Sequence, residues 1–317
     1  MQKLKAHFGP KLEELVPLKE HTTLQIGGPA KAFIKAQTPE ELLEALTLAH
    51  QEQLPFLVIG GGSNLLVADE GIEHLIIKNE LTGIEVEGTS ITVQSGTPLQ
   101  SLVDFTLQRG LAGIHKLIGI PGTVGGAIFG NAGAYGQTIN DHLEEVVVFD
   151  GREIKVLSKA ECSFAYRHSG FKNNKFTILE AHFQLKPADP LKLQAESTQV
   201  LTERQLKYSP NLRCPGSFFK NIVVENIPPQ ILQLIPPEKV TFGKIPAGFL
   251  LESVAAKGEK LGNIQISSSH ANLFLNLGEG RASDFYQLAQ KFAQKVKEKY
   301  GLTLEPEVQI LGLPPLI

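Results

Sequence analysis

Two glycine-rich segments are the first places in this sequence where the residue types indicate binding chemistry. The first reads Gly60-Gly61-Gly62-Ser63-Asn64 and directly follows an apolar stretch. Glycine lets consecutive backbone N–H groups turn toward one point, and such a nest binds the oxygens of a pyrophosphate. Ser63 and Asn64 could add side-chain donors. A tight turn between two strands is an alternative of equal weight, because glycine runs are common there.

The first segment does not match the common nucleotide-binding fingerprints. A Rossmann loop would need a third glycine where Leu65 stands, with a helix opening there. The residues that follow, Leu-Leu-Val-Ala-Asp-Glu-Gly, are too few and too soon broken for that helix, and the lysine of a P-loop is missing. A ligand site here would therefore be a nest outside a Rossmann fold.

The second segment, residues 119–136, combines many glycines with apolar side chains. Flexible linkers are polar, so this composition excludes a linker. Glycine permits close backbone approach, and apolar side chains add contact area, which together suit packing against a large flat ligand. A glycine-rich contact between two helices is the alternative.

Capping signals predict the helices that would position these segments. Residues 38–54 predict a helix with Thr38 as N-cap and Glu41 completing a capping box. The same signature at Thr97 predicts a second helix, which Gly110 would end. Residues 191–206 have weaker helical character. A last, amphipathic helix is predicted to be capped by Ser283 and ended by Gly301.

Short apolar or alternating runs predict the strands. They cover residues 56–59, 75–77, 145–149, 175–185, 217–224, 270–277 and 304–311, with a hairpin over 84–94. Glu307 would lie within the last of these strands. Strands and helices mix without strict βαβ order, so the fold class is α+β rather than a doubly wound sheet.

The bulk composition limits the classes of function. A chain of 317 residues predicts two or three domains. A net charge of -3 without a basic run argues against a nucleic-acid partner. No apolar stretch is long enough to cross a membrane, and the N-terminal residues lack the core of a signal peptide. Cys162 and Cys214 show no metal-ligand spacing, so we expect reduced thiols, no metal and a cytoplasmic location.

In this order, and about sixty residues apart, the two glycine segments resemble the FAD-binding half of the UDP-N-acetylenolpyruvoylglucosamine reductase family. The shared patterns are Gly-Ser-Asn-Leu-Leu in the first, and Ile-Pro-Gly-Thr-Val-Gly-Gly leading to Asn-Ala-Gly-Ala-Tyr-Gly in the second. An upstream island at residues 21–30 also matches. Further islands lie at residues 164–169, 215–221 and 304–308.

Two features refine this resemblance. The spacing between Arg167 and Ser217 is short, which is similar to the compact type II branch of the family. The chain departs from the family pattern at Ile222, where Pro is common, and at Gly130, where Met is frequent. Neither position carries a group with an expected catalytic role, so the departures concern local loop geometry.

The resemblance implies an FAD-binding fold of the vanillyl-alcohol-oxidase-like (PCMH-type) class, followed by a C-terminal α+β substrate domain. We expect three domains: FAD-binding subdomain 1 at residues 1–80, FAD-binding subdomain 2 at 81–200 and a substrate-binding domain at 201–303. A terminal strand within 304–317 would return to the first. Pro210 and Pro215 mark the boundary before the substrate domain.

The implied reaction has two steps. A hydride moves from NADPH to FAD and then to C3 of the enolpyruvyl group of UDP-N-acetylglucosamine-enolpyruvate. A proton added at C2 gives UDP-N-acetylmuramate, a precursor of peptidoglycan, which ties the chain to cell-wall synthesis, cell shape and division. The resemblance further implies a monomer without a membrane or nucleic-acid partner. Another flavin oxidoreductase on the same FAD fold is the alternative.

Three catalytic residues are carried over from the resemblance. Arg167 would bind the enolpyruvyl carboxylate, because a planar guanidinium can do so bidentately. Ser217 would donate the proton to C2. Glu307 would polarise the same carboxylate or relay a proton, and a carboxyl group that faces a carboxylate is driven toward its protonated form. Without the resemblance, Arg167 would be interpreted as part of a surface ion pair, Ser217 as a turn residue and Glu307 as a charged residue at a strand edge.

The remaining predicted contacts fall into two groups. The cofactor-binding residues are Gly60, Gly61, Gly62, Ser63, Asn64, Ile120, Pro121, Gly122, Thr123, Gly125, Gly126 and Gly133. The substrate-binding residues are Lys207, Asn221 and Tyr135.

Overall fold

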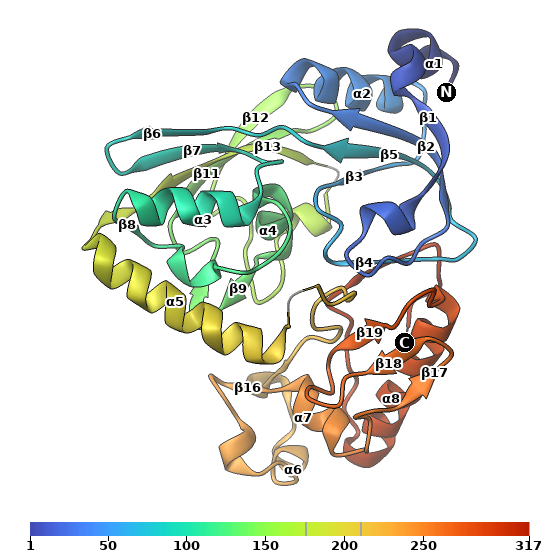
Figure 1. Ribbon diagram of the computed structural model, residues 1–317, viewed down its shortest axis with the longest axis vertical. Coiled ribbons are helices and arrows are strands. Elements are labelled where there is room, and N and C mark those ends of the chain that lie inside the picture. Colours follow the sequence, from blue (N-terminus) through green and yellow to red (C-terminus); the bar gives the residue numbers. More distant parts are fainter. Residues whose placement is uncertain (175, 210, 317) are drawn as a thin grey trace. The chain divides into compact units, whose positions relative to one another are not determined.

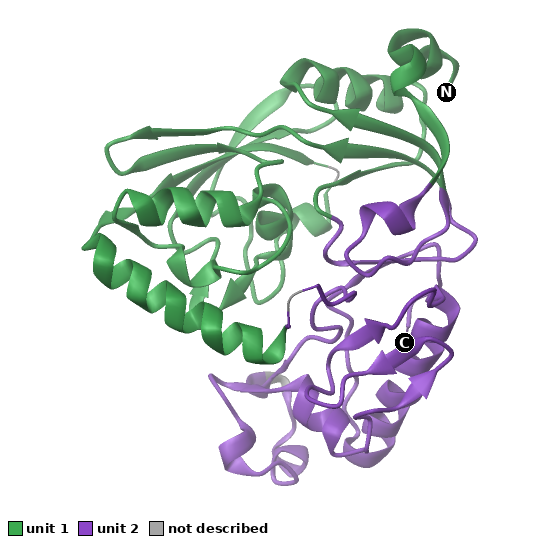
Figure 2. Cartoon of the chain, viewed as in Figure 1, with its two compact units in different colours: residues 1–16, 30–61, 73–208 green, residues 17–29, 62–72, 209–317 purple. Residues whose placement is uncertain are grey.

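The computed structural model describes residues 1–174, 176–209 and 211–316. The chain forms two compact units, each assembled from separated stretches of sequence (Figure 2). Unit 1 comprises residues 1–16, 30–61 and 73–208, and unit 2 comprises residues 17–29, 62–72 and 209–317. Both units mix helices with strands, which confirms the α+β prediction (Figure 1).

A four-stranded sheet forms one part of unit 1. Its order is β1 (Glu13–Pro17), β2 (Pro29–Ala36), β5 (Ile72–Asn79) and β3 (Phe56–Ile59). Strands β3 and β5 run parallel, and helices α1 (Gln2–Phe8) and α2 (Pro39–Gln51) pack on the sheet (Figure 1). The predicted cap of α2 is confirmed, because the Thr38 hydroxyl accepts from the Glu41 N–H at 3.2 Å.

A five-stranded antiparallel sheet forms the other part of unit 1. Its order is β12 (Ile154–Ser158), β11 (Leu143–Phe149), β13 (Thr177–Gln184), β7 (Ser90–Gln94) and β6 (Ile84–Glu87). Helices α3 (Leu99–Gln108), α4 (Val124–Gly130) and α5 (Pro190–Lys207) bury apolar side chains against it (Figure 1). The predicted hairpin over 84–94 is confirmed. Of the predicted strand 175–185, Lys175 lies outside the described residues. Four two-residue strands complete the unit: β8 (Leu111–Ala112), β9 (Gly133–Ala134), β10 (Gln137–Thr138) and β14 (Lys186–Pro187).

Unit 2 combines short strands with helices around an aromatic core. Its strands are β4 (Leu65–Val67), β15 (Ile222–Val223), β16 (Lys244–Ile245), β17 (Lys260–Leu261), β18 (Ile264–Ile266), β19 (Phe274–Asn276) and β20 (Gln309–Leu311). Its helices are α6 (Pro229–Leu232), α7 (Ala247–Glu252) and α8 (Ala282–Tyr300). Strand β20 pairs with β4 in parallel, although their sequences are far apart. Phe218, Phe219, Phe274 and Phe285 are buried together in the core.

Two predicted helix caps are wrong. Helix α3 begins at Leu99 with Pro98 at the N-cap position and no side-chain cap. The Thr97 hydroxyl instead exchanges hydrogen bonds with the backbone of Gly83, because the chain before α3 is buried against this segment. Gly110 does follow the helix with φ +65°, as predicted.

Helix α8 begins at Ala282, so Ser283 lies within it rather than at its cap. The cap comes from the distant Asp69, whose two carboxylate oxygens accept from the N–H groups of Ala282 at 2.7 Å and Ser283 at 3.0 Å. A carboxylate here satisfies two backbone donors that the helix leaves unpaired. Gly301 ends the helix in the left-handed conformation, as predicted.

The predicted strands of unit 2 are longer than the observed ones. The run 304–311 is a strand only at Gln309–Leu311, and Glu307 lies in the bend before it. Pro306 explains this difference, since a residue without an N–H interrupts regular strand pairing. The runs 217–224 and 270–277 are likewise strands only at Ile222–Val223 and Phe274–Asn276.

No helix among residues 1–174, 176–209 and 211–316 is long and apolar enough to cross a membrane. Pro210, predicted as part of a domain boundary, and Ile317, in the predicted returning segment, lie outside these described residues.

Candidate functional site

The two glycine segments meet in unit 1. Gly60 and Gly61 follow β3, and a Cβ atom on Gly60 would lie 2.2 Å from the Thr123 hydroxyl oxygen. A Cβ on Gly61 would lie 2.9 Å from the Cα of Gly122. Both distances are shorter than van der Waals contact, so a side chain at position 61 would meet backbone and one at position 60 would have to displace the Thr123 side chain. Glycine here lets the two loops touch backbone to backbone.

A cavity of about 530 Å³ opens at this contact, within the range of volumes that hold small ligands. Its lining residues are Gln37, Gly60, Gly61, Lys78, Asn79, Glu80, Thr82, Gly96, Pro98 and Thr123. Three of these, Gly60, Gly61 and Thr123, were predicted cofactor-binding residues. The cavity therefore joins both glycine segments to the ends of β2 and β5.

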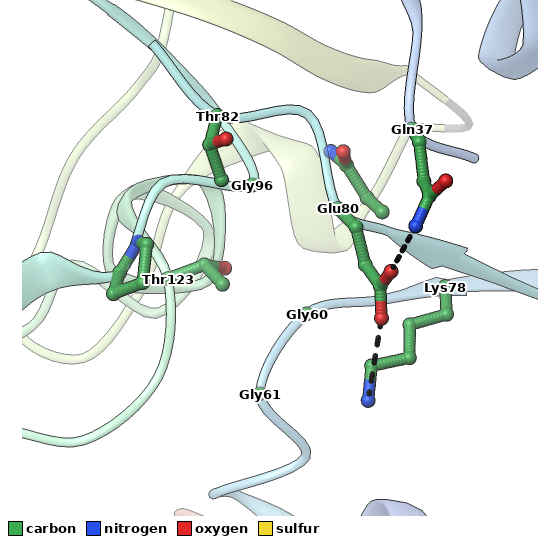
Figure 3. A pocket seen from close by; sticks show the side chains of 10 residues that line it. Gln37, Gly60, Gly61, Lys78, Glu80, Thr82, Gly96 and Thr123 are labelled. Atoms are coloured by element: carbon green, nitrogen blue, oxygen red, sulfur yellow. Dashed lines mark hydrogen bonds and ion pairs between the residues drawn. The ribbon is translucent and has the colours of Figure 1, made fainter. Parts of the chain in front are cut away.

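Charged and polar side chains line the part of the cavity formed by the ends of β2 and β5 (Figure 3). One Glu80 carboxylate oxygen accepts from the Gln37 amide at 3.2 Å, and the other lies 3.9 Å from the Lys78 ammonium. The amide of Asn79 donates to the Ser95 hydroxyl at 2.7 Å. The cavity thus offers a carboxylate, an ammonium and amides beside backbone that is accessible because glycine has no side chain.

Sequence reasoning missed Gln37, Lys78, Glu80 and Thr82. For Lys78, Glu80 and Thr82, the available signal was their position after the predicted strand 75–77, since polar side chains beyond strand ends often line ligand sites. For Gln37 there was no such signal, because no strand was predicted before it. No local pattern indicated that β2 and β5 are neighbours in the sheet, so the sequence did not show that Gln37 and Glu80 would meet.

Three of the predicted cofactor-binding residues of the first segment fall in unit 2. Gly62 has φ +63°, and a Cβ there would lie 1.9 Å from the carbonyl oxygen of His21. Ser63 lies half-buried in the turn that follows. The Asn64 amide donates to the Glu307 carbonyl at 3.1 Å, and the Asn64 carbonyl accepts from the Gln309 N–H at 3.0 Å. The structure therefore links Asn64 to the segment that carries Glu307.

The second glycine segment contains the short helix α4, which the sequence analysis did not predict. Thr123 caps it by accepting from the Gly126 N–H at 3.3 Å. A Cβ on Gly125 would lie 2.9 Å from that of Ser95, and one on Gly133 would lie 2.7 Å from the Thr138 methyl group. Internal packing thus requires glycine at 125 and 133, whatever else these residues contact. Ile120 packs against the core of unit 1, whereas Pro121 is exposed.

Asn131 ends α4 in the left-handed conformation and is buried. Its amide group donates to the Ala165 carbonyl at 2.8 Å. Within the described part of the chain, its Oδ1 atom is buried without a hydrogen-bond partner. A buried acceptor of this kind is costly unless a bound group satisfies it. Asn131 is therefore a polar feature of this segment that sequence reasoning did not single out.

Arg167 lies in a tight turn of unit 1, in which Ala165 and His168 exchange both backbone hydrogen bonds. Its φ of +53° is strained for a residue with a side chain, and such strain is typical of functional sites. The Arg167 Nη2 donates to the Gly133 carbonyl at 2.9 Å. The guanidinium is thus anchored to the second glycine segment.

Ser217 and Glu307 lie on adjacent segments of unit 2. The Glu307 N–H donates to the Phe218 carbonyl at 2.7 Å, next to Ser217. The Lys220 N–H donates to the Glu305 carbonyl at 2.9 Å, so the two segments run side by side. Both Ser217 and Glu307 are half-buried. The structure therefore brings together two residues that the sequence separates by almost a third of the chain.

The three predicted substrate contacts have the following surroundings. Tyr135 is 40% exposed with φ +52°, and burial raises the pKa of its hydroxyl, while Arg204 opposes this shift. Lys207 ends α5 with its ammonium 5.3 Å from the Tyr208 ring centre. The Asn221 side chain accepts from the Ala247 N–H at 3.1 Å, which ties it to the start of α7.

Comparison with known proteins assigns the two parts of the chain separately. Residues 30–155 match the family model of an FAD binding domain. Residues 208–311 match the C-terminal domain of UDP-N-acetylenolpyruvoylglucosamine reductase. The first match contains the cavity and both glycine segments. The second contains Ser217 and Glu307.

Relatives match along nearly the whole chain. The UDP-N-acetylenolpyruvoylglucosamine reductases of Solibacter usitatus and Rubrobacter xylanophilus are each 37% identical, over 93% and 94% of this chain and 95% and 94% of their own lengths. The crystal structure of the Thermus caldophilus reductase is 32% identical, with a TM-score of 0.76 over 94% of this chain and 98% of that one. These matches confirm an FAD-binding fold followed by a C-terminal domain of this family.

Proposed function

The chain belongs to the UDP-N-acetylenolpyruvoylglucosamine reductase family, and we propose that it is an FAD-dependent oxidoreductase that makes UDP-N-acetylmuramate. Its substrate is UDP-N-acetylglucosamine-enolpyruvate and its hydride donor is NADPH. The observation that carries the proposal is the contact of the two glycine segments around one cavity, inside the stretch that matches an FAD binding domain.

The residues of this cavity fit FAD. Gly60 and Gly61 leave no room for a Cβ, so the backbone itself forms the wall that a flat, phosphate-bearing cofactor would touch. The Lys78 and Glu80 pair supplies a cation and an acceptor, groups that suit phosphate and ribose hydroxyls. When bound, FAD supplies the hydride transfer chemistry that no side chain can perform. We propose the other predicted cofactor-binding residues as further cofactor contacts: Gly62, Ser63, Asn64, Ile120, Pro121, Gly122, Gly125, Gly126 and Gly133.

We propose that Arg167 binds the enolpyruvyl carboxylate and the negative charge that develops there. A guanidinium whose orientation is already restrained loses less freedom when it binds a carboxylate bidentately. The bond from Nη2 to the Gly133 carbonyl supports this role, because it restrains the guanidinium. The positive φ of Arg167 is a second support, since a strained backbone is retained where function requires it.

Ser217 is proposed as the proton donor to C2, and Glu307 as the group that acts on the substrate carboxylate or relays the proton. A serine hydroxyl is a weak acid, so its surroundings must stabilise the alkoxide that forms. A carboxyl group beside the substrate carboxylate favours its protonated form and could supply that proton. The Glu307 N–H bond to the Phe218 carbonyl supports the pairing, because it places both segments in one hydrogen-bonded unit.

Substrate recognition is proposed to involve Tyr135, Lys207 and Asn221. Lys207 offers an ammonium for the diphosphate, and Asn221 and Tyr135 offer polar groups for the sugar. The exposed position and positive φ of Tyr135 support its assignment.

We also propose a cytoplasmic monomer that takes part in peptidoglycan precursor synthesis and hence in cell shape and division. Nucleotide sugars and NADPH are cytoplasmic metabolites, which supports that location. The net charge of -3 supports the absence of a nucleic-acid partner. Membership of the type II branch stays a prediction.

The three-domain division at residues 1–80, 81–200 and 201–303 also stays a proposal. The parallel pairing of β20 with β4 supports a return of the terminal segment toward the earlier part of the chain.

The test uses purified protein. It is expected to be yellow, to release FAD on denaturation, and to oxidise NADPH faster when the enolpyruvyl UDP-sugar is added. UDP-N-acetylglucosamine, which lacks the enolpyruvyl group, is the matched control and should not accelerate oxidation. A colourless protein without flavin would refute the proposal, as would equal NADPH oxidation with both sugars.

A further inference from the structure

Asn272 is hydrogen-bonded to the backbone of the two residues that follow Ser217. Its side-chain oxygen accepts from the Phe219 N–H at 2.9 Å, and its side-chain NH₂ group donates to the Phe219 carbonyl at 2.8 Å. Its backbone carbonyl accepts from the Phe218 N–H at 3.0 Å. One residue thus makes three hydrogen bonds to the two residues that follow Ser217.

The Asn272 side chain that makes these bonds is buried and is itself held in place. Asn272 is only 2% exposed, so its bonds do not compete with water. Its own N–H donates to Nδ1 of His270 at 3.1 Å, and Leu273 bridges to Ser217. A carboxamide is the side chain that can accept and donate in one plane, as a neighbouring strand would. Asn272 therefore completes strand-like pairing where regular strand structure is absent.

The opposite side of the same segment contacts Glu307. The Phe218 carbonyl accepts from the Glu307 N–H, and Phe219 bridges to Pro306. Pro306 has no N–H, which removes one bond from this side of the pairing. The Glu307 carbonyl is in turn bound by the Asn64 amide. The segment after Ser217 thus lies between Asn272 on one side and the Glu307 segment on the other.

Side-chain packing alone does not set this register. The rings of Phe218 and Phe219 are buried with their centres 4.7 Å apart, which fixes how deeply the segment sits in the core. Aromatic contacts are weakly directional, whereas hydrogen bonds to a peptide group fix its plane. The orientation of the peptides next to Ser217 therefore depends on Asn272.

We infer that Asn272 is a positioning residue for the proposed reaction: its carboxamide sets the segment of Ser217 in register with that of Glu307. The inference rests on the proposed function, because it assumes that these two residues act on the enolpyruvyl group. Asn272 does not need to touch substrate. It acts through the peptide groups of Phe218 and Phe219.

The chain offers a matched control in Asn276. This residue lies four positions later, is 5% exposed and donates to the Leu24 carbonyl at 3.0 Å, while its side-chain oxygen accepts from the Gly278 and Gly280 N–H groups. Like Asn272, it therefore uses its buried carboxamide both to donate and to accept hydrogen bonds. None of these side-chain bonds is made to the segments that carry Ser217 or Glu307. Asn272→Asp and Asn276→Asp each keep the acceptor and remove the amide donor.

The measurement separates the two half-reactions by stopped-flow absorbance of the flavin, together with Tm and the substrate KM. Asn272→Asp is expected to slow flavin reoxidation by the enolpyruvyl UDP-sugar by about tenfold to a hundredfold, the scale of a misplaced reacting group. Flavin reduction by NADPH should stay within about twofold of the wild-type rate. Asn276→Asp should lower Tm without slowing reoxidation relative to reduction.

A pH series adds a readout that a merely structural role would not produce. The buried carboxyl group that Asn272→Asp introduces would take up a proton as pH falls, and its O–H could then donate to the Phe219 carbonyl. The reoxidation deficit of Asn272→Asp, relative to wild type at each pH, is expected to shrink toward low pH. Reoxidation at the wild-type rate throughout, or an equal deficit in Asn276→Asp, would overturn the inference.

Two further outcomes remain decisive. If Asn272→Asp does not fold, Asn272→Ser, which removes the carboxamide without adding a charge, should show the same split between half-reactions. An equal loss of both half-reactions in that variant would overturn the inference. Failure of the wild-type flavin to be reoxidised by the enolpyruvyl UDP-sugar would instead refute the proposed function itself.

Discussion

Gly61 and Gly122 touch through their backbones: a Cβ atom on Gly61 would lie 2.9 Å from the Cα of Gly122. These residues belong to the two glycine segments, which meet only in the folded chain. The atom in the way is backbone, so it cannot move aside as the end of a long side chain could. The wall of the proposed FAD cavity depends on this contact.

Gly61→Ala is accordingly expected to separate the two segments and weaken FAD binding by about tenfold or more, equivalent to about 1.4 kcal/mol. The measurement is FAD titration of the apoprotein, followed by flavin fluorescence. Gly130→Ala is the control, because a Cβ there meets nothing within 4 Å. Alanine also favours helix α4, so the control should bind FAD normally. Unchanged FAD affinity in Gly61→Ala would contradict the cavity assignment.

Ser217→Ala should leave flavin reduction by NADPH nearly intact and slow flavin reoxidation by substrate by about 10²- to 10⁴-fold, the usual contribution of a positioned proton donor. The hydroxyl is needed only when the proton is delivered to C2. Rapid-mixing measurements of the two half-reactions test this, with Ser283→Ala, on α8, as a serine control outside the proposed site. Collapse of the first half-reaction in Ser217→Ala would show that the proton-donor assignment is wrong.

Arg167→Lys should lower turnover at saturating substrate by about tenfold or more, because an ammonium cannot hold a carboxylate bidentately. The variant also loses the planar donor that bonds to the Gly133 carbonyl. Steady-state kinetics with the enolpyruvyl UDP-sugar measure the effect. Arg152→Lys, at an exposed turn, is the control and should behave as wild type. Wild-type turnover in Arg167→Lys would argue against a catalytic role.

Asp69→Ala should lower the free energy of unfolding by about 1–2 kcal/mol at neutral pH, the usual cost of a lost helix cap. Burial raises the pKa of the Asp69 carboxyl, but hydrogen bonds from the Ser283 and Ala282 N–H groups outweigh it, so the pKa in the folded state is lowered. A lowered folded-state pKa gives stability that is present above the ordinary value of 3.8 and is lost as pH falls through the folded-state value.

Chemical denaturation of wild type and Asp69→Ala across pH measures this effect. The difference in unfolding free energy should be constant near neutral pH and shrink in acid, below the ordinary pKa of an aspartate. Asp104→Ala, on an exposed face of α3, is the control and should show only a small change. A difference that grows as pH falls would show that the cap has been assigned wrongly.

Local features of this chain were predictable from the sequence because they depend on neighbouring residues. The Thr38 hydroxyl accepts from the Glu41 N–H and the Glu41 carboxylate accepts from the Gln37 N–H, so both bonds lie within five residues. The hairpin over 84–94 likewise turns within a few residues. Gly110 and Gly301 adopt the left-handed conformation that ends a helix. In each case the residues that decide the structure are adjacent along the chain, so their types suffice.

The errors arose where a distant segment competed for the same polar group. Thr97 could have capped α3, but its hydroxyl bonds to Gly83. Ser283 could have capped α8, but Asp69 takes that place from more than two hundred residues away. Sequence patterns carry no information about which distant backbone group will arrive at a cap.

The candidate site divides in the same way. The sequence by itself determined the two glycine segments, the family resemblance and the residue types of Arg167, Ser217 and Glu307. Only the tertiary structure decided that Gly61 meets Gly122 and that Glu80 pairs with Gln37 and Lys78. It also decided that the Asn272 side chain hydrogen-bonds to both backbone groups of Phe219. Those contacts come from strand pairing and core burial between segments far apart in the chain. Such contacts stabilise the protein only once the whole fold has brought the partners together.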